Sequence, residues 1–284
     1  MPRAYIAFGS NLGDRTRALD RAGELLRAQP GIDVLRTSSY RETRPVGGPP
    51  GQGFFLNAVA ELDTNLPPAE LLAVLRRIEH SLGRTRHERW EPRRLDLDLL
   101  FYDDFCLKTS ELTLPHPRIP FRRFVLEPLA EISPDFVHPT LQRTIRDLVD
   151  HLRRTPRRLL IAAADASHSS RLAQAVAAKT SAVLISAEPR RPTATQLAPD
   201  SSDDSRRILE AIAADRWRVS TTAVARSSGA AAASEEAFRE VPTLVARLDA
   251  SAEFPPGVLV LDLVGLGFED QLVEILAAMG GIED

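Results

Sequence analysis

The sequence predicts an α+β fold for a first domain and an α/β fold for a second. Three observations indicate this. The chain has 284 residues, more than the roughly 100 to 200 of one domain. Strand and helix spacings of apolar residues alternate along residues 5–101. Thr155-Pro156-Arg157-Arg158 then has the composition of a linker. We therefore expect one domain over residues 1–154 and another over residues 155–284.

The first elements follow from a short apolar run and a turn. Residues 5–8 are expected to form a strand, and the turn at 9–14 places Asp14 or a neighbour at the cap of a helix. Apolar residues at helical spacing define the buried face of that helix: Leu19, Ala22, Leu25 and Leu26. The helix is expected to stop at Pro30-Gly31.

The rest of the first domain follows the same rules. Residues 32–40 read as a second strand. Residues 44–53 hold too much glycine and proline for regular structure, and so long a loop in a compact domain tends to be functional, so we expect a mobile lid. Further elements are expected as a strand over 54–62, a helix over 67–82 that ends at Gly83, and a strand over 95–101. This order is the ferredoxin-like βαββαβ core.

Added helices are expected to close the first domain. A proline-rich loop over 114–120 holds His116, and apolar spacing then predicts helices over 125–132 and 141–152.

The second domain opens with a βαβ pattern. A strand is expected over 159–163, a helix over 170–178 and a strand over 182–186. Four later segments complete the expectation: a loop over 188–204, low-complexity sequence over 227–234 that we expect to be disordered, a strand over 258–264 and a helix over 270–279.

Composition restricts the function classes. The formal net charge of −3 argues against a broad nucleic-acid surface. Cys106 is the single cysteine, which excludes an intrachain disulfide framework and a cysteine-based zinc cluster. No apolar stretch approaches the roughly 20 residues that span a bilayer, and the N-terminus lacks the pattern of a signal peptide. We expect a cytoplasmic protein without a membrane partner.

Two aspartates on an apolar strand indicate phosphate chemistry. Because strand side chains alternate, Asp96 and Asp98 share one face while Leu95, Leu97 and Leu99 point into the core. Two strand residues rise about 6.6 Å, so both carboxylates can converge on one or two divalent cations, and an all-oxygen site suits Mg²⁺. A half-solvated antiparallel strand has the same pattern, so spacing alone leaves that alternative open.

Five arginines between residues 84 and 94 precede this strand. A guanidinium group binds phosphate oxygens through two parallel hydrogen bonds and keeps its charge at any working pH. Arginine runs are also common on solvated surfaces. Together with the two carboxylates, the run favours a site for one polyanionic small molecule.

Several motifs in a fixed order give the sequence a family resemblance. They are the arginine loop, the Asp-Leu-Asp strand, Gly9-Ser10-Asn11, Phe55-Leu56-Asn57-Ala58 and Pro115-His116-Pro117-Arg118. In combination they resemble 6-hydroxymethyl-7,8-dihydropterin pyrophosphokinase over roughly residues 4–152. The resemblance implies transfer of the terminal pyrophosphoryl unit of ATP to the hydroxymethyl group of the reduced pterin, releasing AMP, in folate biosynthesis.

The resemblance also implies roles for particular residues. Asp96 and Asp98 would hold two Mg²⁺ ions, and Arg84 and Arg93 would bind phosphate oxygens. The nucleotide-contacting positions would be Glu79, Trp90, Thr113, His116 and Arg122. The pterin-contacting positions would be Thr43, Val46, Phe55, Asn57 and Phe124. The expected partners are therefore ATP and the pterin, with no nucleic acid.

Each of these residues has an ordinary alternative. Phe55 and Phe124 would by default be core aromatics, and His116 a simple loop histidine. The remaining alternatives are packing for Trp90, a strand-end cap for Asn57 and a solvent-facing acid for Glu79. Two positions depart from the family pattern: Glu111 stands where a relative can place arginine, and Arg44 where some members have proline.

The second domain has the rhythm of a P-loop kinase over residues 159–175, and Leu172-Ala173-Gln174-Ala175 is similar to the helix of deoxynucleoside kinases. The glycines and the lysine of a phosphate-binding loop are missing, and Asp165 stands where an anion would sit. We expect a degenerate kinase-like accessory domain. Two alternatives are a bifunctional enzyme with an active nucleoside kinase and a non-catalytic module that binds pterin or nucleotide.

Overall fold

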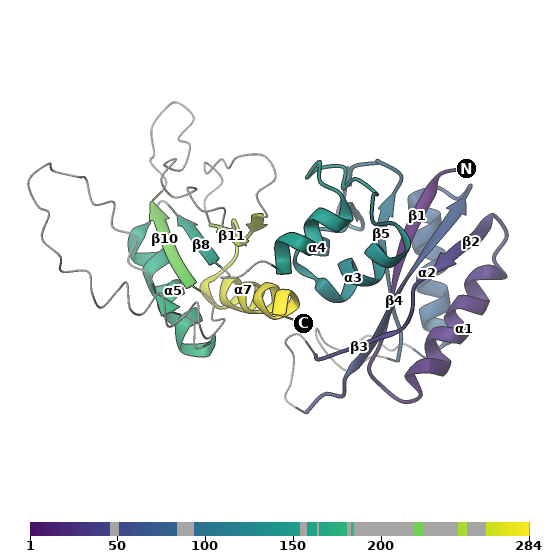
Figure 1. The fold of residues 1–284 in the computed structure, drawn as a ribbon, viewed down its shortest axis with the longest axis horizontal. Helices are drawn as coiled ribbons and strands as arrows, with labels where there is room; N and C mark the ends of the chain where they lie inside the picture. Colours follow the sequence, from purple (N-terminus) through teal and green to yellow (C-terminus); the bar gives the residue numbers. More distant parts are fainter. Residues whose placement is uncertain are drawn as a thin grey trace, which may run out of the picture. The chain divides into compact units, whose positions relative to one another are not determined.

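The computed structural model describes residues 1–45, 51–83, 94–153, 158–163, 165–180, 183–184, 218–223, 244–248 and 260–283. The chain divides into two compact units, Met1–Leu152 with Ala278–Asp284 and Arg153–Ala277 (Figure 1). Among the residues described, no helix combines the length and the apolar character needed to cross a bilayer.

The first unit is built on an antiparallel sheet. Its described strands are β1 (Arg3–Ser10), β2 (Ile32–Thr37), β3 (Arg41–Thr43), β4 (Phe55–Thr64) and β5 (Asp96–Tyr102). They are ordered β2-β4-β1-β5, and β3 pairs with β4 beyond the end of β2. The expected α+β class with an antiparallel sheet is thereby confirmed for this unit.

Helices α1 (Arg15–Arg27) and α2 (Pro68–Ser81) cover one face of the sheet (Figure 1). The Asp14 carboxylate accepts a hydrogen bond from the Arg17 N–H at 3.0 Å and so caps α1, as expected. Leu19, Ala22 and Leu26 are buried in the core, whereas Leu25 packs at its margin. Alternate residues of β1, β4 and β5 complete this core, among them Ile6, Phe8, Ala58, Ala60, Leu97 and Leu99.

The other face carries α3 (Arg123–Ile132), the 3-10 helix η1 (Ile119–Phe121) and α4 (Ile145–Arg153) (Figure 1). Tyr5, Phe101 and Phe136 pack their rings there with centroid distances of 4.9 to 6.1 Å. A short hairpin of β6 (Leu107–Lys108) and β7 (Thr113–Leu114), which the sequence did not predict, leads into this layer.

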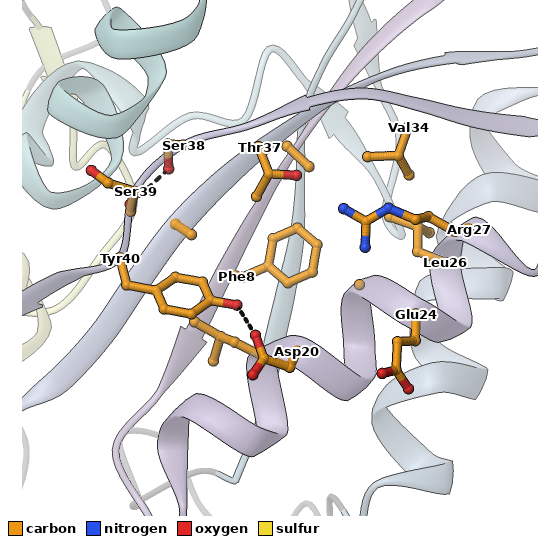
Figure 2. Close-up of a pocket in the computed structure, with 14 residues that line it drawn as sticks. Phe8, Asp20, Glu24, Leu26, Arg27, Val34, Thr37, Ser38, Ser39 and Tyr40 are labelled. Carbon is orange, nitrogen blue, oxygen red and sulfur yellow. Dashed lines mark hydrogen bonds between the residues drawn. The ribbon is translucent and has the colours of Figure 1, made fainter.

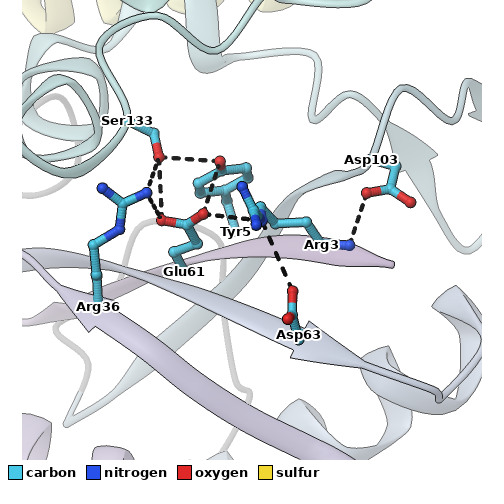
Figure 3. A network of polar contacts seen from close by, with 7 residues as sticks. All are labelled: Arg3, Tyr5, Arg36, Glu61, Asp63, Asp103 and Ser133. Carbon is cyan, nitrogen blue, oxygen red and sulfur yellow. Dashed lines mark hydrogen bonds and ion pairs between the residues drawn. The ribbon is translucent and has the colours of Figure 1, made fainter. Parts of the chain in front are cut away.

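Hydrogen bonds and ion pairs of Glu61, on β4, connect the end of α3 to this face of the sheet. The Glu61 side chain is 0% exposed, and Arg3 Nε lies 3.1 Å from its Oε1. The Ser133 hydroxyl, just after α3, donates to Glu61 Oε2 at 3.2 Å and accepts from the Tyr5 hydroxyl at 3.0 Å. Arg36 of β2 also pairs with Glu61 (Figure 3). One buried carboxylate thus joins three strands to the end of a helix.

Two predicted elements of the first unit differ from their expected bounds by three residues or more at one end. The expected strand over 32–40 breaks after Thr37 because Ser38 turns its side chain to the neighbouring strand, where its hydroxyl accepts from the Val59 N–H at 3.0 Å. The expected helix over 141–152 begins at Ile145, since Gln142 has a φ of +53°. The Thr144 hydroxyl accepts from the Asp147 N–H at 3.1 Å and so caps this helix, and the Asp147 carboxylate accepts in return from the Thr144 N–H at 3.3 Å.

The second unit contains a parallel sheet. Its described strands are β8 (Arg158–Ala163), β9 (Val183–Leu184), β10 (Arg218–Ala223), β11 (Leu244–Arg247) and β12 (Val260–Asp262), in the order β12-β11-β8-β10-β9. Helix α5 (Ala166–Thr180) follows β8, and α7 (Phe268–Glu283) follows β12. The sequence predicted neither β10 nor β11, and it started α5 four residues late. Residues 188–204 and 227–234, expected to be loop and disordered, lie outside the described residues.

Candidate functional site

A row of three residues crosses the sheet where the predicted motifs meet. Gly9 of β1 lies opposite Asn57 of β4 on one side and opposite Asp96 of β5 on the other. A Cβ atom at Gly9 would lie 3.3 Å from Asn57 Oδ1, tighter than ordinary contact. Glycine therefore leaves room for the Asn57 amide, which is 6% exposed and donates to the Thr43 hydroxyl of β3 at 2.8 Å. The row thus extends to Thr43.

Asp96 and Asp98 lie on one face of β5, as the alternation predicts. Leu97 and Leu99 on the opposite face are 4% and 3% exposed, whereas both aspartates are half-buried. Arg122, just before α3, brings Nη1 to 3.6 Å from Asp98 Oδ2. A guanidinium group therefore lies next to one carboxylate of the pair.

His116 lies beside this pair in the loop after β7. The His116 N–H donates to the Leu100 carbonyl at 2.9 Å, which fixes the loop against β5. Burial lowers the pKa of His116 to about 4, with Arg122 and Arg118 acting in the same direction and Asp98 opposing them. Because Nδ1 accepts from the Arg118 N–H at 3.2 Å, the neutral ring carries its proton on Nε2. His116 is thus a neutral hydrogen-bond donor at neutral pH.

Glu79 differs from the solvent-facing alternative. Its side chain is 3% exposed, and Oε1 accepts from the Leu97 N–H at 2.8 Å. Because β5 is the edge strand of this sheet, Glu79 supplies a partner for an edge amide between the two aspartates. The contact holds the Asp-Leu-Asp segment in place.

Phe55 and Phe124 are half-buried, so the core-aromatic alternative is wrong for both. Phe55 pairs with Thr43 in the β3–β4 ladder, next to Asn57. Arg122 Cζ lies 5.4 Å from the centre of the Phe124 ring, within the range of a cation–π contact. Each aromatic ring therefore stands close to one polar member of the predicted site.

For the remaining predicted site residues, the structure gives only the exposure and the element, or the residue lies outside the described range. Thr113 is half-buried in β7, and Glu111 is exposed in the turn before it. Arg44 is exposed at the end of β3. Four predicted site residues lie outside the described residues: Val46, Arg84, Trp90 and Arg93. The expected lid is described only at residues 44–45 and 51–53.

Two residues near the site received no role from the sequence. Gly9 and Arg118 both belong to the motifs used for the resemblance. A glycine at the end of an apolar strand can indicate a close approach by a neighbouring strand, and this signal could have identified Gly9. Arg118 had no signal beyond its charge.

The donor set of the site fits a hard cation. Among the described residues, no group of three or more histidine, cysteine, aspartate or glutamate side chains converges on one point. Two half-buried carboxylates on one face can supply oxygen ligands to Mg²⁺, which usually takes its other ligands from water and substrate phosphates.

A separate cavity of about 540 Å³ lies between α1 and strands β2 and β4 (Figure 2). Phe8, Ala58 and Ala60 form its apolar floor, and the Tyr40 hydroxyl donates to Asp20 at its rim at 2.5 Å. The predicted site residues are absent from its lining. Its walls belong to the face of the sheet that carries α1, whereas Asp96 and Asp98 lie on the opposite face.

Comparison with known proteins finds one family over the first half of the chain. The family model described as 7,8-dihydro-6-hydroxymethylpterin-pyrophosphokinase (HPPK) matches residues 5–134. The 2-amino-4-hydroxy-6-hydroxymethyldihydropteridine pyrophosphokinase of Bacillus subtilis is 49% identical over 129 residues, which are 45% of this chain and 77% of that protein.

Two further relatives carry the same name. The one from Methylorubrum extorquens is 47% identical over 138 residues, covering 48% of this chain and 86% of the relative. The one from Haemophilus influenzae is 39% identical over 154 residues, covering 53% of this chain and 96% of the relative. Each alignment spans most of the relative but about half of this chain.

Proposed function

Because the chain belongs to the 7,8-dihydro-6-hydroxymethylpterin-pyrophosphokinase family, we propose that residues 1–154 transfer pyrophosphate from ATP to 6-hydroxymethyl-7,8-dihydropterin with Mg²⁺, releasing AMP and the pterin diphosphate. One observation carries the proposal. Asp96 and Asp98 face Arg122 and His116 at the end of the row that runs through Asn57. Oxygen ligands for a cation and donors for phosphate thus adjoin the polar side chains of Asn57 and Thr43. The order β2-β4-β1-β5 further supports a ferredoxin-like layout for this domain.

We propose that Asp96 and Asp98 would hold two Mg²⁺ ions, whose chemistry there would be neutralisation of the charge on the triphosphate and orientation of the pterin hydroxyl. The protein's own cations bind the phosphates from the other side. Arg122 lies next to Asp98, and the Nε2–H of His116 can donate to a phosphate oxygen. Phosphoryl transfer depends on positioning and charge neutralisation, so the site requires no nucleophilic side chain.

The remaining nucleotide-binding roles rest on the family resemblance. We assign Arg84 and Arg93 to phosphate oxygens and Trp90 to the loop that closes over the nucleotide. Glu79 and Thr113 complete the nucleotide side, where Glu79 would act by holding β5.

We assign the pterin pocket to Thr43, Val46, Phe55, Asn57 and Phe124. A pterin is flat and rich in hydrogen-bond donors and acceptors. Its binding site therefore needs aromatic side chains that stack on the ring and polar groups that hydrogen-bond its edge. The half-buried rings of Phe55 and Phe124 offer the faces. The hydrogen bond to Thr43 orients the Asn57 amide, which would form hydrogen bonds with the polar edge of the pterin.

We propose that residues 155–284 form a degenerate kinase-like α/β domain without phosphotransfer activity. The parallel order β12-β11-β8-β10-β9, with α5 following the central strand β8, supports kinase-like ancestry. The Asp165 carboxylate occupies the N-terminus of α5, where it accepts from the Ser167 N–H at 2.8 Å and the His168 N–H at 3.2 Å. Those hydrogen bonds lower the pKa of Asp165. An anionic phosphate would have to displace this carboxylate.

The same carboxylate argues against an active nucleoside kinase in the second domain. A non-catalytic sensor is disfavoured by the half-buried pair Asp96 and Asp98, because a binding module has no need for two cation ligands.

The deciding experiment incubates the full-length protein with ATP, Mg²⁺ and 6-hydroxymethyl-7,8-dihydropterin and separates the nucleotides by chromatography. We expect AMP in equal amount to the pterin diphosphate. Formation of ADP would indicate transfer of a single phosphoryl group. No pterin-dependent product at all would favour the sensor.

A further inference from the structure

Glu127, in the middle of α3, joins two arginines that come from different elements. Its side chain is 12% exposed. Oε1 accepts from Arg123 Nη2 at 2.8 Å and from Arg123 Nε at 3.2 Å, while Oε2 lies 3.3 Å from Arg41 Nη1. A carboxylate that receives charged donors on both oxygens fixes the separation of those donors.

Each of the two arginines lies close in the chain to residues that we assign to the pterin pocket. Arg123 stands between Arg122 and Phe124 in the sequence. Arg41 is the first residue of β3, and Thr43 at the end of β3 accepts the hydrogen bond from Asn57. The contacts of Glu127 therefore link α3, which carries Phe124, to β3, which carries Thr43 and through it contacts Asn57.

The β3 segment depends on such contacts because it is short. It pairs with β4 over three residues, and so short a ladder contributes little stability by itself. A second carboxylate of α3 strengthens the link: Glu131 accepts from the Ser39 N–H at 2.8 Å and the Ser39 hydroxyl at 2.7 Å, and lies 3.7 Å from Arg41 Nη2. These hydrogen bonds lower the pKa of Glu131.

We propose that Glu127 is a positioning residue for the pterin. It holds Arg41 and Arg123 at a fixed separation, so that Thr43 and Asn57 face Phe124 at the width of one flat heterocycle. The inference rests on the proposed function, because it assumes that this pocket receives the pterin. Small displacements of a substrate-binding wall reduce turnover strongly, which gives the bridge a measurable effect.

The test measures KM for pterin and for ATP separately in Glu127→Gln and Arg41→Met, with unfolding midpoints recorded alongside. We expect the pterin KM to rise roughly tenfold in both variants. The ATP KM should stay within about twofold in Arg41→Met, because β3 lies on the pterin side. The double variant should be no worse than the more impaired single variant, since both substitutions break the contact between Glu127 and Arg41. Arg41→Lys should recover part of the loss.

The matched control is Asp135→Asn, which removes a carboxylate from the exposed ion pair with Arg146 just beyond α3. It should leave both KM values unchanged. If Glu127→Gln fails to fold, Arg41→Met decides the question, because the Arg41 side chain is 40% exposed.

Two outcomes separate this inference from the proposed function. Normal AMP formation with an unchanged pterin KM in Arg41→Met, or an equal rise in both KM values, would overturn the positioning role alone. Absence of pterin-dependent AMP formation by the unsubstituted protein would overturn the proposed function together with this inference.

Discussion

Glu61 and Asp98 are carboxylates on the same face of the same sheet, and they have opposite surroundings. Glu61 is 0% exposed and is surrounded by Arg3, Tyr5, Arg36 and Ser133. The Asp98 side chain is 36% exposed, with a guanidinium nitrogen at 3.6 Å. A fully buried carboxylate whose two oxygens already accept hydrogen bonds or ion pairs contributes to the stability of the fold. A half-open one can accept a cation or a phosphate-bound metal. Burial, rather than residue type or strand position, separates the two roles.

Replacement of Asp98 tests the open side of this comparison and should have the largest effect. Asp98→Ala is expected to lower the rate of AMP formation at least about a hundredfold, since it removes an electrostatic stabiliser of the transition state. The unfolding midpoint should change little because the side chain is half-exposed. The measurement is kcat with saturating ATP and pterin. Persistent activity in this variant would break the proposed mechanism.

Replacement of Glu61 tests the sealed side. Glu61→Gln should lower the free energy of unfolding by about 2 kcal/mol, because the guanidinium groups of Arg3 and Arg36 lose the carboxylate with which they pair. Activity per folded molecule should remain within about twofold. Urea titrations measure the stability, and assays well below the transition measure the rate. A large loss of kcat without loss of stability would mean that Glu61 belongs to the site.

A buried histidine extends the comparison to pH. Burial lowers the pKa of His138 to about 4, and His138 is 3% exposed against the Phe101 ring. Its folded pKa lies below the unfolded value of about 6.5, so the unfolded chain binds more protons between these values. The stability contribution is therefore complete above pH 6.5 and is lost as the pH falls toward 4.

This linkage predicts a moderate effect in acid. Between pH 7.5 and pH 5, His138 should account for about 2 kcal/mol of lost stability. His138→Asn keeps an acceptor near the Leu141 N–H but cannot titrate, so its stability should depend less on pH in that range. His80→Asn, at an exposed position, is the control. An equal pH dependence in His138→Asn and the unsubstituted protein would refute the assignment.

Asp165 is a third kind of carboxylate: it is exposed, but it accepts hydrogen bonds from backbone N–H groups at the start of α5. Its replacement should have the smallest effect on catalysis. Asp165→Ala is expected to leave the rate of AMP formation within about twofold, because the proposed function places the whole reaction in residues 1–154. Calorimetry on the unsubstituted full-length chain should detect one ATP site. A second site that Asp165→Ala weakens would instead favour a nucleotide-binding second domain.

The sequence predicted the elements of the first unit well because their signals are local. Alternation placed Asp96 and Asp98 on one face, and helical spacing placed Leu19 and Leu26 in the core. The break after Thr37 was missed because Ser38 is satisfied by Val59, a residue from another strand. Strands β10 and β11 of the second unit were missed as well, and short parallel strands carry a weak pattern.

The sequence by itself determined the order of the main elements of the first unit, the identity of the family and the side of the strand from which the two aspartates project. The elements and the side of the strand depend on residues close together in the chain, and the family depends on motifs that can be read in order along it. The tertiary structure decided which carboxylates are sealed and which remain open, and it brought Thr43, Asn57, Gly9 and Asp96 into one row. Burial and strand pairing depend on segments far apart in the sequence, and no local pattern records which distant side chain will supply a partner.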